Sequence, residues 1–312
     1  MQPFSPTSPA LPRQARRSSS FQNPQAGSFP AAGGEQGRRG HATETTAAAA
    51  PIAVAAAWLA LCPLAQAAPD PQEPPYGISG RVGLVVANVP TYEGSPNRRT
   101  LVGPDLTLTY RSREWGTVEF GQRGLFWNAL ESGLFRLALV AQFDPGRTES
   151  KPSSLNPIAG DKRLAGMGKV PSSTEAGVGI GYGPFMVVAR QSLSERGHKG
   201  AQVDMTIEMP WSVSDRLNLR LALGATWADR DYMQTHFGVT AAQAQATSFA
   251  AYTPKAGCRK VEANVGAEYT LASRWKLQAS VGLTQLGDVA AASPIVGRKN
   301  NASAALGLAH EF

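Results

Sequence analysis

Apolar and polar residues alternate along most of the chain after residue 77. The alternation is strongest at 201–211, 216–227, 260–271 and 275–284. Weaker forms of the same pattern occur at 78–89, 101–111, 115–124, 133–143, 174–182 and 184–193. Because successive side chains of a β-strand point to opposite faces, each segment predicts a strand with one apolar and one polar face.

The last ten residues follow the same alternation and end on an aromatic side chain. Leu306, Leu308 and Phe312 fall on one face, and small or polar residues occupy the positions between them. A carboxy-terminal strand of this kind is typical of bacterial outer-membrane barrels, in which it closes the barrel. We therefore predict that these three residues form the barrel-closing terminus.

Two classes of all-β protein fit the pattern: a transmembrane barrel, and a soluble sandwich or lipocalin-like barrel. The strands are about ten residues long, which suffices to cross a bilayer at a tilt. Trp115, Trp211 and Trp275 lie beside short turns, and Trp227 lies at the opposite end of its strand. Aromatic residues at both strand ends are typical of the interfacial girdles of membrane barrels. The sequence thus predicts an antiparallel transmembrane β-barrel of the outer membrane.

The connections between the segments differ in length. Short connections follow 101–111, 174–182, 201–211 and 260–271, whereas 144–171 and 228–257 are long. Short turns are expected in the periplasm and long loops outside the cell. Eleven segments alternate, but a barrel with both chain ends in the periplasm needs an even number. We predict twelve strands, with the missing one inside 144–171, or ten if a weak segment is no strand.

The amino-terminal part predicts export. Residues 47–67 combine an uncharged apolar stretch with Ala65-Gln66-Ala67, small residues at the positions that a signal peptidase requires. Residues 1–46 are rich in Ser, Pro, Gly and Gln and predict a disordered leader, whose length suggests that the reading frame was assigned too early a start. Residues 68–77 would form a linker, and residues 78–312 the barrel.

Charge and cysteine content narrow the choice of function. The first 67 residues hold five Arg and two Glu, so they contribute +3 of the formal +7, and nucleic-acid binding is not indicated. Cys62 would leave with the signal peptide, and Cys258 would then be alone. Neither an intramolecular disulfide nor a cysteine metal site is expected.

Charged residues on the polar faces of the strands are expected to line the lumen. They carry both signs on neighbouring strands, which predicts pairing across the lumen, and a barrel of ten to twelve strands is narrow enough for such side chains to fill. A paired lining predicts no conductance, whereas a continuous lining of one sign would predict a channel. The predicted lumen charges are Asp204, Glu208, Arg216, Arg220, Lys260, Glu262, Glu268 and Lys276.

The 228–257 loop is the strongest candidate for a functional segment, because loops of this length are uncommon without a role. It either folds into the barrel and binds a partner or narrows the lumen, or it packs its aromatic residues on the rim. Its candidate residues are Asp229, Asp231, Tyr232, Met233, Gln234, His236 and Phe237.

Catalytic, metal and cofactor sites are not predicted. His198 lies near Ser192 and Ser194 in a short polar loop, but no motif fixes a Ser–His geometry. His236 and Asp231 lack a third ligand at a metal-binding spacing. The sequence therefore predicts a protein that is not an enzyme.

Several loops resemble one family of outer-membrane proteins. The segments that carry the resemblance are Tyr92-Glu93-Gly94-Ser95, Tyr232-Met233-Gln234 followed by Phe237-Gly238-Val239, and 287–296. Together with the terminal strand they closely resemble the MipA/OmpV family over residues 78–312. His310 replaces the tyrosine expected near the end, and Arg259-Lys260 stands where a plainer joint is expected.

The resemblance implies a monomeric outer-membrane barrel that acts as a scaffold. Its expected partners are membrane lipid, the barrel assembly machinery, and a lytic transglycosylase that the barrel links to a murein synthase. The alternative function is a narrow diffusion channel for small solutes.

Overall fold

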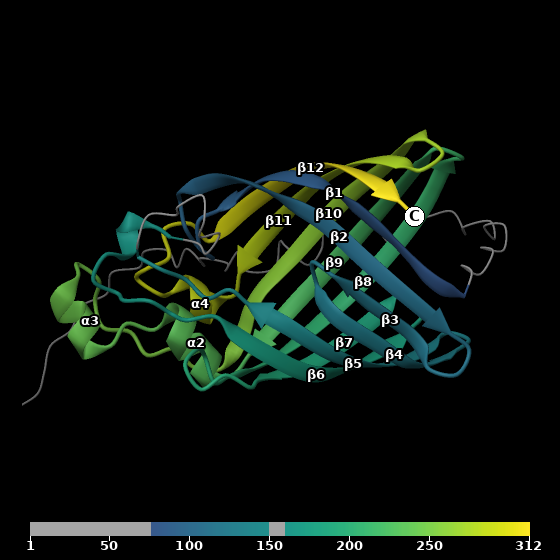
Figure 1. Ribbon diagram of the computed structural model, residues 1–312. Coiled ribbons are helices and arrows are strands. Elements are labelled where there is room, and N and C mark those ends of the chain that lie inside the picture. Colours follow the sequence, from purple (N-terminus) through teal and green to yellow (C-terminus); the bar gives the residue numbers. More distant parts are fainter. Residues whose placement is uncertain (1–75, 150–159) are drawn as a thin grey trace, which may run out of the picture. The chain divides into compact units, whose positions relative to one another are not determined.

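The computed structural model describes residues 76–149 and 160–312, which form one closed antiparallel barrel of twelve strands (Figure 1). Each strand pairs with its sequence neighbours, and the last strand pairs with the first. The predicted leader, signal peptide and nearly all of the linker lie outside the described residues. The strands are β1 Gly77–Pro90, β2 Arg98–Ser112, β3 Gly116–Gly121, β4 Gly124–Ser132, β5 Phe135–Asp144, β6 Ser173–Tyr182, β7 Phe185–Ser192, β8 Ala201–Ser214, β9 Leu217–Ala228, β10 Gly257–Ala272, β11 Trp275–Leu286 and β12 Asn300–Glu311.

The terminal strand closes the barrel as predicted. In the register of β12 with β1, Leu308 lies opposite Leu84 and Leu306 lies opposite Val86. Phe312 completes the closure, because its backbone exchanges both hydrogen bonds with Gly80. The large apolar side chains of β12, Leu306 and Leu308, face outward and are exposed.

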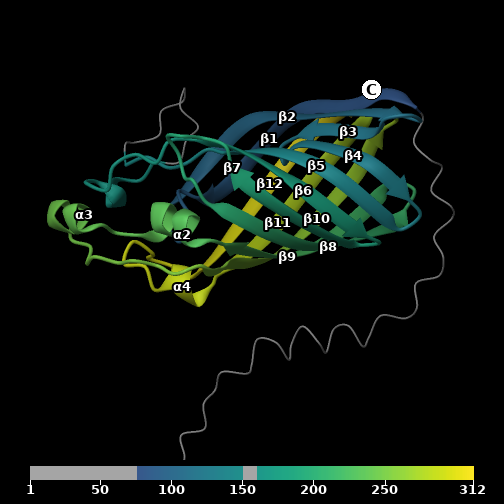
Figure 2. The same cartoon turned by 90° about the horizontal axis from the view of Figure 1, so that it is seen from below.

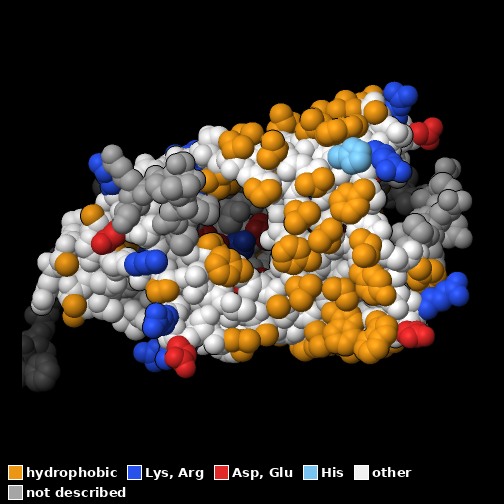
Figure 3. Space-filling view, viewed as in Figure 1, with side chains coloured by type: hydrophobic (Ala, Val, Ile, Leu, Met, Phe, Trp, Pro, Cys, Tyr) orange, Lys and Arg blue, Asp and Glu red, His pale blue; other side chains and the backbone are white. Residues whose placement is uncertain are grey.

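Large apolar side chains cover the outer face of the barrel (Figure 3). Every strand contributes to this surface, which would be an aggregation hazard in water but suits a hydrocarbon phase. Trp115, Trp211 and Trp275 are exposed beside the short turns, and Trp227 is exposed at the opposite end of its strand. The outward apolar belt with aromatic residues at both ends is that of a transmembrane barrel of the outer membrane.

The twelfth strand is β4, which the sequence analysis missed, so the expectation of a hidden strand inside 144–171 is wrong. Leu125, Phe126 and Trp127 are consecutive apolar residues that break the alternation. A bulge between Asn128 and Leu130 shifts the register further. A turn of only Gln122 and Arg123 joins β4 to β3, so the predicted segment 115–124 covers β3 and the turn and leaves nearly all of β4 unassigned.

The long connections all lie at one end of the barrel, opposite the short turns that follow β2, β4, β6, β8 and β10 (Figures 1 and 2). The two-residue turn between β3 and β4 points toward the end with the long connections. We call the described residues of these connections the cap: 91–97, 145–149, 160–172, 193–200, 229–256 and 287–299. The cap contains the 3₁₀ turn η1 Lys162–Leu164 and the helices α2 Arg230–Phe237, α3 Ala241–Ala246 and α4 Asp288–Ala291. No helix in the part of the chain that the structure describes is long and apolar enough to span a bilayer.

The cap has a packed core of its own. Tyr232, Met233 and Phe237 of α2 pack against the ends of β9 and β11 and against α4. A second cluster joins Tyr92 and Ile295, which come from connections far apart in the chain, with residues of the 160–172 segment. The loops are therefore fixed to one another and to the barrel mouth.

The barrel wall is low at the β3–β4 hairpin. Pairing of β2 with β3 begins only at Leu108, and pairing of β5 with β4 ends at Ala141. Above the hairpin, residues 98–107 of β2 and 142–144 of β5 thus border what we call the lateral gap. Figure 3 shows the surface hollowed in the space that Figure 1 leaves between β2 and the end of β5, with charged side chains visible inside.

Candidate functional site

Seven of the eight predicted lumen charges lie on strands and face the interior of the barrel. Asp204, Glu208, Arg220, Lys260, Glu262 and Glu268 line its cavities. Lys276 pairs with Glu268 at 3.6 Å. Arg216 differs, because it lies in the turn before β9 and not on a strand.

Near the short turns, a network of ion pairs includes one pair between strands that are not neighbours, Arg81 and Glu268. Arg81 of β1 lies 3.4 Å from Asp105 of β2 and 3.9 Å from Glu268 of β10. Lys276 of β11 bridges Glu268 and Glu311 of β12, at 3.6 and 3.5 Å. Because β11 and β12 separate β10 from β1, this network follows a chord through the lumen.

A second chord runs from the tip of the β3–β4 hairpin. Arg123 Nη1 lies 3.1 Å from Glu208 Oε1 of β8, although β5, β6 and β7 separate the two in the barrel order. Gln122 beside it donates to Asp105 Oδ1 at 3.3 Å, which joins the second chord to the first. The hairpin tip therefore projects inward across the lumen.

The described residues enclose at least two cavities in the lumen. A cavity of about 380 Å³ near the short turns includes Arg81, Asp105, Arg220 and Glu268 in its lining. A larger one of about 950 Å³ extends from Gly183 at a turn up to Arg259 below the cap. Pro210 belongs to the lining of both cavities, and the walls of both carry both signs of charge.

Below the cap, two arginines organise the lumen. Arg190 of β7 donates to Glu175 Oε2 at 2.7 Å and also pairs with Asp204. Arg259 of β10 donates to Gln202 Oε1 and to Tyr232 Oη, and it lies 3.2 Å from Glu93 of the first loop. Arg259 therefore ties two strands, α2 and the first loop together.

Helix α2 is fixed in the mouth of the barrel by its first residues. Asp229 is its N-cap: Oδ1 accepts from the Tyr232 N–H at 2.9 Å, and Oδ2 accepts from the Ala201 N–H of β8. Of the candidate loop residues, Tyr232, Met233 and Phe237 are buried and Asp231 is exposed. Gln234 is partly buried. Its backbone oxygen accepts from the N–H of Gly238, the C-cap residue of α2.

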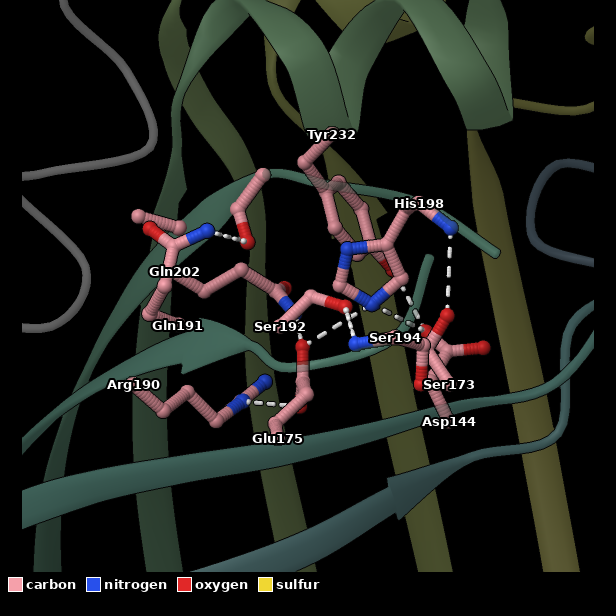
Figure 4. Close-up of polar contacts among 12 residues, drawn as sticks. Asp144, Ser173, Glu175, Arg190, Gln191, Ser192, Ser194, His198, Gln202 and Tyr232 are labelled. Carbon is pink, nitrogen blue, oxygen red and sulfur yellow. Dashed lines mark hydrogen bonds and ion pairs between the residues drawn. The ribbon is translucent and has the colours of Figure 1, made fainter. Parts of the chain in front are cut away.

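Three groups distant in the sequence meet directly under α2. Asp144 Oδ2, at the end of β5, lies 3.8 Å from His198 Nε2 and 3.7 Å from His236 Nε2. Tyr232 stacks on His236 with ring centroids 4.3 Å apart, and it meets His198 edge-on at 4.8 Å. Figure 4 shows the His198 ring between Tyr232 and the carboxyl groups of Asp144 and Glu175.

Burial controls the protonation of the α2 side chains. It lowers the pKa of His236 to about 3, although Asp144 opposes this shift and Arg147 supports it. Burial also raises the pKa of the Tyr232 phenol. His236 is therefore neutral at physiological pH, and Tyr232 keeps its proton.

The serines near His198 do not face its ring as a nucleophile would. Ser194 Oγ accepts from the Thr174 N–H at 2.8 Å, and Ser192 Oγ accepts from the Ser194 N–H at 3.2 Å. Ser173 Oγ accepts from the backbone N–H of His198 at 3.1 Å. These hydroxyls hold the loop, and the described residues bring His198 instead to Asp144 and His236.

Comparison of the sequence with models of protein families identifies its family. The family model described as MltA-interacting protein MipA matches residues 82–312. The chain belongs to the MipA family. No curated protein matches the sequence.

Solved structures similar to this MipA-family chain are outer-membrane barrels. An outer-membrane channel from Pseudomonas putida F1 shares 16% identity over 78% of this chain and 100% of its own, with a TM-score of 0.43. A monoaromatic hydrocarbon channel, CymD, shares 10% identity over 77% of this chain and 89% of its own, with a TM-score of 0.35. An anion-selective porin from Comamonas acidovorans shares 10% identity over 75% of this chain and 98% of its own, with a TM-score of 0.31.

Several charged residues inside this MipA-family barrel were not predicted from the sequence. Glu175 and Arg190 lie on weakly alternating strands, and Asp144 lies at the edge of a segment read as loop. Glu175 and Arg190 stand at polar positions of their strands, which is a signal that could have placed them in the lumen. The meeting of Asp144 with two histidines had no such signal, because it depends on how three connections fold.

Proposed function

We propose that this MipA-family barrel is an interaction protein of the outer membrane and not an open pore. The carrying observation is the obstructed lumen: ion-pair chords cross it, and a packed cap covers the end that bears the long loops. A barrel built in this way has a stable body in the membrane and presents two rims for binding. No catalytic role forms part of the proposal.

The partner that we propose is a lytic transglycosylase, and through it a murein synthase. The description of the family model, MltA-interacting protein, supports this choice. The short turns provide the surface that would face the murein. They expose Arg113, Glu114, Asp215, Arg216 and Arg274, a mixture of charges suited to a soluble partner.

Binding to a purified lytic transglycosylase of the MltA type tests the scaffold function. The full protein is placed in nanodiscs, and binding is measured by surface plasmon resonance against empty nanodiscs. The turn variant Arg113→Ser/Arg216→Ser/Arg274→Ser should bind more weakly, because it loses charges on the proposed surface. The matched cap variant Arg196→Ser/Arg230→Ser, which removes exposed arginines at the opposite end, should bind as the unaltered protein does. Absence of binding, or equal loss in both variants, would contradict the proposal.

The lateral gap supports a second candidate function, a narrow conduit for small solutes. It opens the wall beside the larger cavity, whose lining includes Gln142 of β5 and Arg123 of the hairpin. A solute could enter from the side without passing the cap. Single-channel recording in planar bilayers distinguishes the two functions: discrete current steps favour the conduit, and a silent barrel that binds the transglycosylase favours the scaffold.

A further inference from the structure

The group under α2 has the composition of a metal site. Two imidazoles and one carboxylate converge, and their ligand atoms all lie within 4.8 Å of one another. A tetrahedral metal with bonds of about 2.0–2.2 Å sets its ligand atoms about 3.4 Å apart. The separations of 3.7 and 3.8 Å from Asp144 Oδ2 exceed this value by only a few tenths of an ångström.

His198 is a buried group with unused bonding capacity. Its side chain is 0% exposed, and neither ring nitrogen makes a hydrogen bond of normal geometry with the described residues. Nε2 lies 3.1 Å from Glu175 Oε1, which also accepts from Gln202, whereas Nδ1 has no partner among the described residues. His236 Nε2 likewise has no hydrogen-bond partner among the described residues. Buried polar atoms are nearly always paired, so these nitrogens point to a missing ligand.

The surrounding structure holds the three donors in place. Asp144 Oδ1 accepts from the Gly146 N–H at 2.7 Å, which orients the carboxyl group, and Oδ2 accepts a bond of 3.3 Å from Tyr232 Oη. The stacked Tyr232 ring fixes the plane of His236. Asp144 and His236 keep 14% and 13% of their side chains exposed, so a small ion could reach the group.

We propose that Asp144, His198 and His236 bind a divalent transition-metal ion, with zinc as the ion that fits best. Imidazole and carboxylate are zinc ligands, and three protein ligands leave a fourth position for water. The ion would join the end of β5, the 193–200 connection and α2. It would thereby clamp the cap onto the barrel independently of which partner the barrel binds.

Isothermal titration with ZnCl₂ tests the proposal on the full protein, extracted from outer membranes in detergent and stripped with a chelator. All samples carry Cys258→Ser, because an exposed thiol can itself bind zinc. One zinc per chain is expected. Asp144→Asn and His236→Gln should each weaken binding by at least about 100-fold, because each removes a direct ligand.

Asp231→Asn is the matched control, since it removes an exposed carboxylate from the same helix without touching the group. Its affinity should equal that of the unaltered protein. Visible absorption of Co²⁺ gives a second readout: bands of tetrahedral cobalt should appear with the unaltered protein and with Asp231→Asn, and not with Asp144→Asn. No stoichiometric binding, or equal binding by all variants, would overturn the proposal.

Discussion

At the residue scale, buried charges determine how the mouth of the barrel is built. Arg259 is the clearest case, because a single guanidinium contacts Gln202, Tyr232 and Glu93 from three parts of the chain. A buried charge that loses its partner is costly, so each member of such a set depends on the others. The basic residue that departs from the expected pattern at the start of β10 thus has a structural role.

We expect Arg259→Ala to lower the free energy of unfolding by about 3 kcal/mol, because it leaves the Glu93 carboxylate and the Tyr232 hydroxyl without this partner. Urea unfolding in lipid vesicles, followed by tryptophan fluorescence, measures the change. Arg274→Ala, in an exposed turn, is the control and should change stability by less than about 0.5 kcal/mol. Equal effects of the two substitutions would contradict the assigned role.

Asp161 predicts a response of the cap to acid. Burial opposes its ionisation, but hydrogen bonds from Thr91, the Arg163 N–H and Ser95 outweigh burial and lower the pKa of the carboxyl group. Since the folded-state pKa is lowered, the stabilisation is complete above the ordinary value of about 4 and is lost as pH falls through the lowered value. Hydrogen exchange of residues 91–97 and 160–170 should therefore accelerate below about pH 4 beyond its intrinsic pH dependence.

Asp161→Asn separates this effect from general acid damage. The variant should show fast exchange in the same two segments already at pH 7, while the strands stay protected. Unchanged exchange at pH 7 would mean that the carboxylate does not hold the loops.

At the element scale, the alternation of apolar and polar residues predicted eleven of the twelve strands, and the structure shows why one was missed. Strand β4 contains Leu125-Phe126-Trp127, and its connection to β3 has only two residues. A strand is recognised from alternating apolar and polar residues that continue without a break and are bounded by recognisable turns. Strand β4 has neither feature. The cap helices α3 and α4 were not predicted either, because they are too short to show a helical period.

The N-cap of α2 provides a test of how this element is fixed. Asp229→Ala should lower stability by about 1 kcal/mol, because the Tyr232 and Ala201 N–H groups lose their acceptor. Chemical denaturation gives the size of the effect, and limited proteolysis locates it in the 229–256 connection. Asp231 is an exposed residue of the same helix, two positions after the N-cap. Asp231→Ala should lower stability by less than half as much as Asp229→Ala. A larger loss for Asp231 than for Asp229 would refute the capping role.

At the scale of the whole molecule, the sequence predicted the barrel class, the even strand number and the mixed charge of the lumen. It predicted pairing across the lumen but not the pair of Arg123 with Glu208, because Arg123 lies at the tip of a hairpin whose tip was read as the end of the 115–124 strand. The lateral gap was unpredictable for the same reason.

Removing the second chord should open the lumen. Arg123→Ala/Glu208→Ala is expected to give brief current steps in planar bilayers where the unaltered protein is silent, because it deletes two side chains that cross the lumen without touching the wall pairing. Arg113→Ala/Glu114→Ala, in an exposed turn, should stay silent. Steps of equal size in the unaltered protein would show that the chord does not obstruct passage.

The low wall at β3 and β4 also has a consequence for the lipids. The six residues of β3 extend over about 20 Å, and tilt shortens the height that they cover, whereas the apolar band of such barrels is about 25 Å tall. On this side, the height of the barrel wall is less than the thickness of the apolar layer of the membrane, which is not so for the longer strands. The outer leaflet should thin locally there, which would give the protein one preferred side for gathering short-chain lipid or neighbouring proteins.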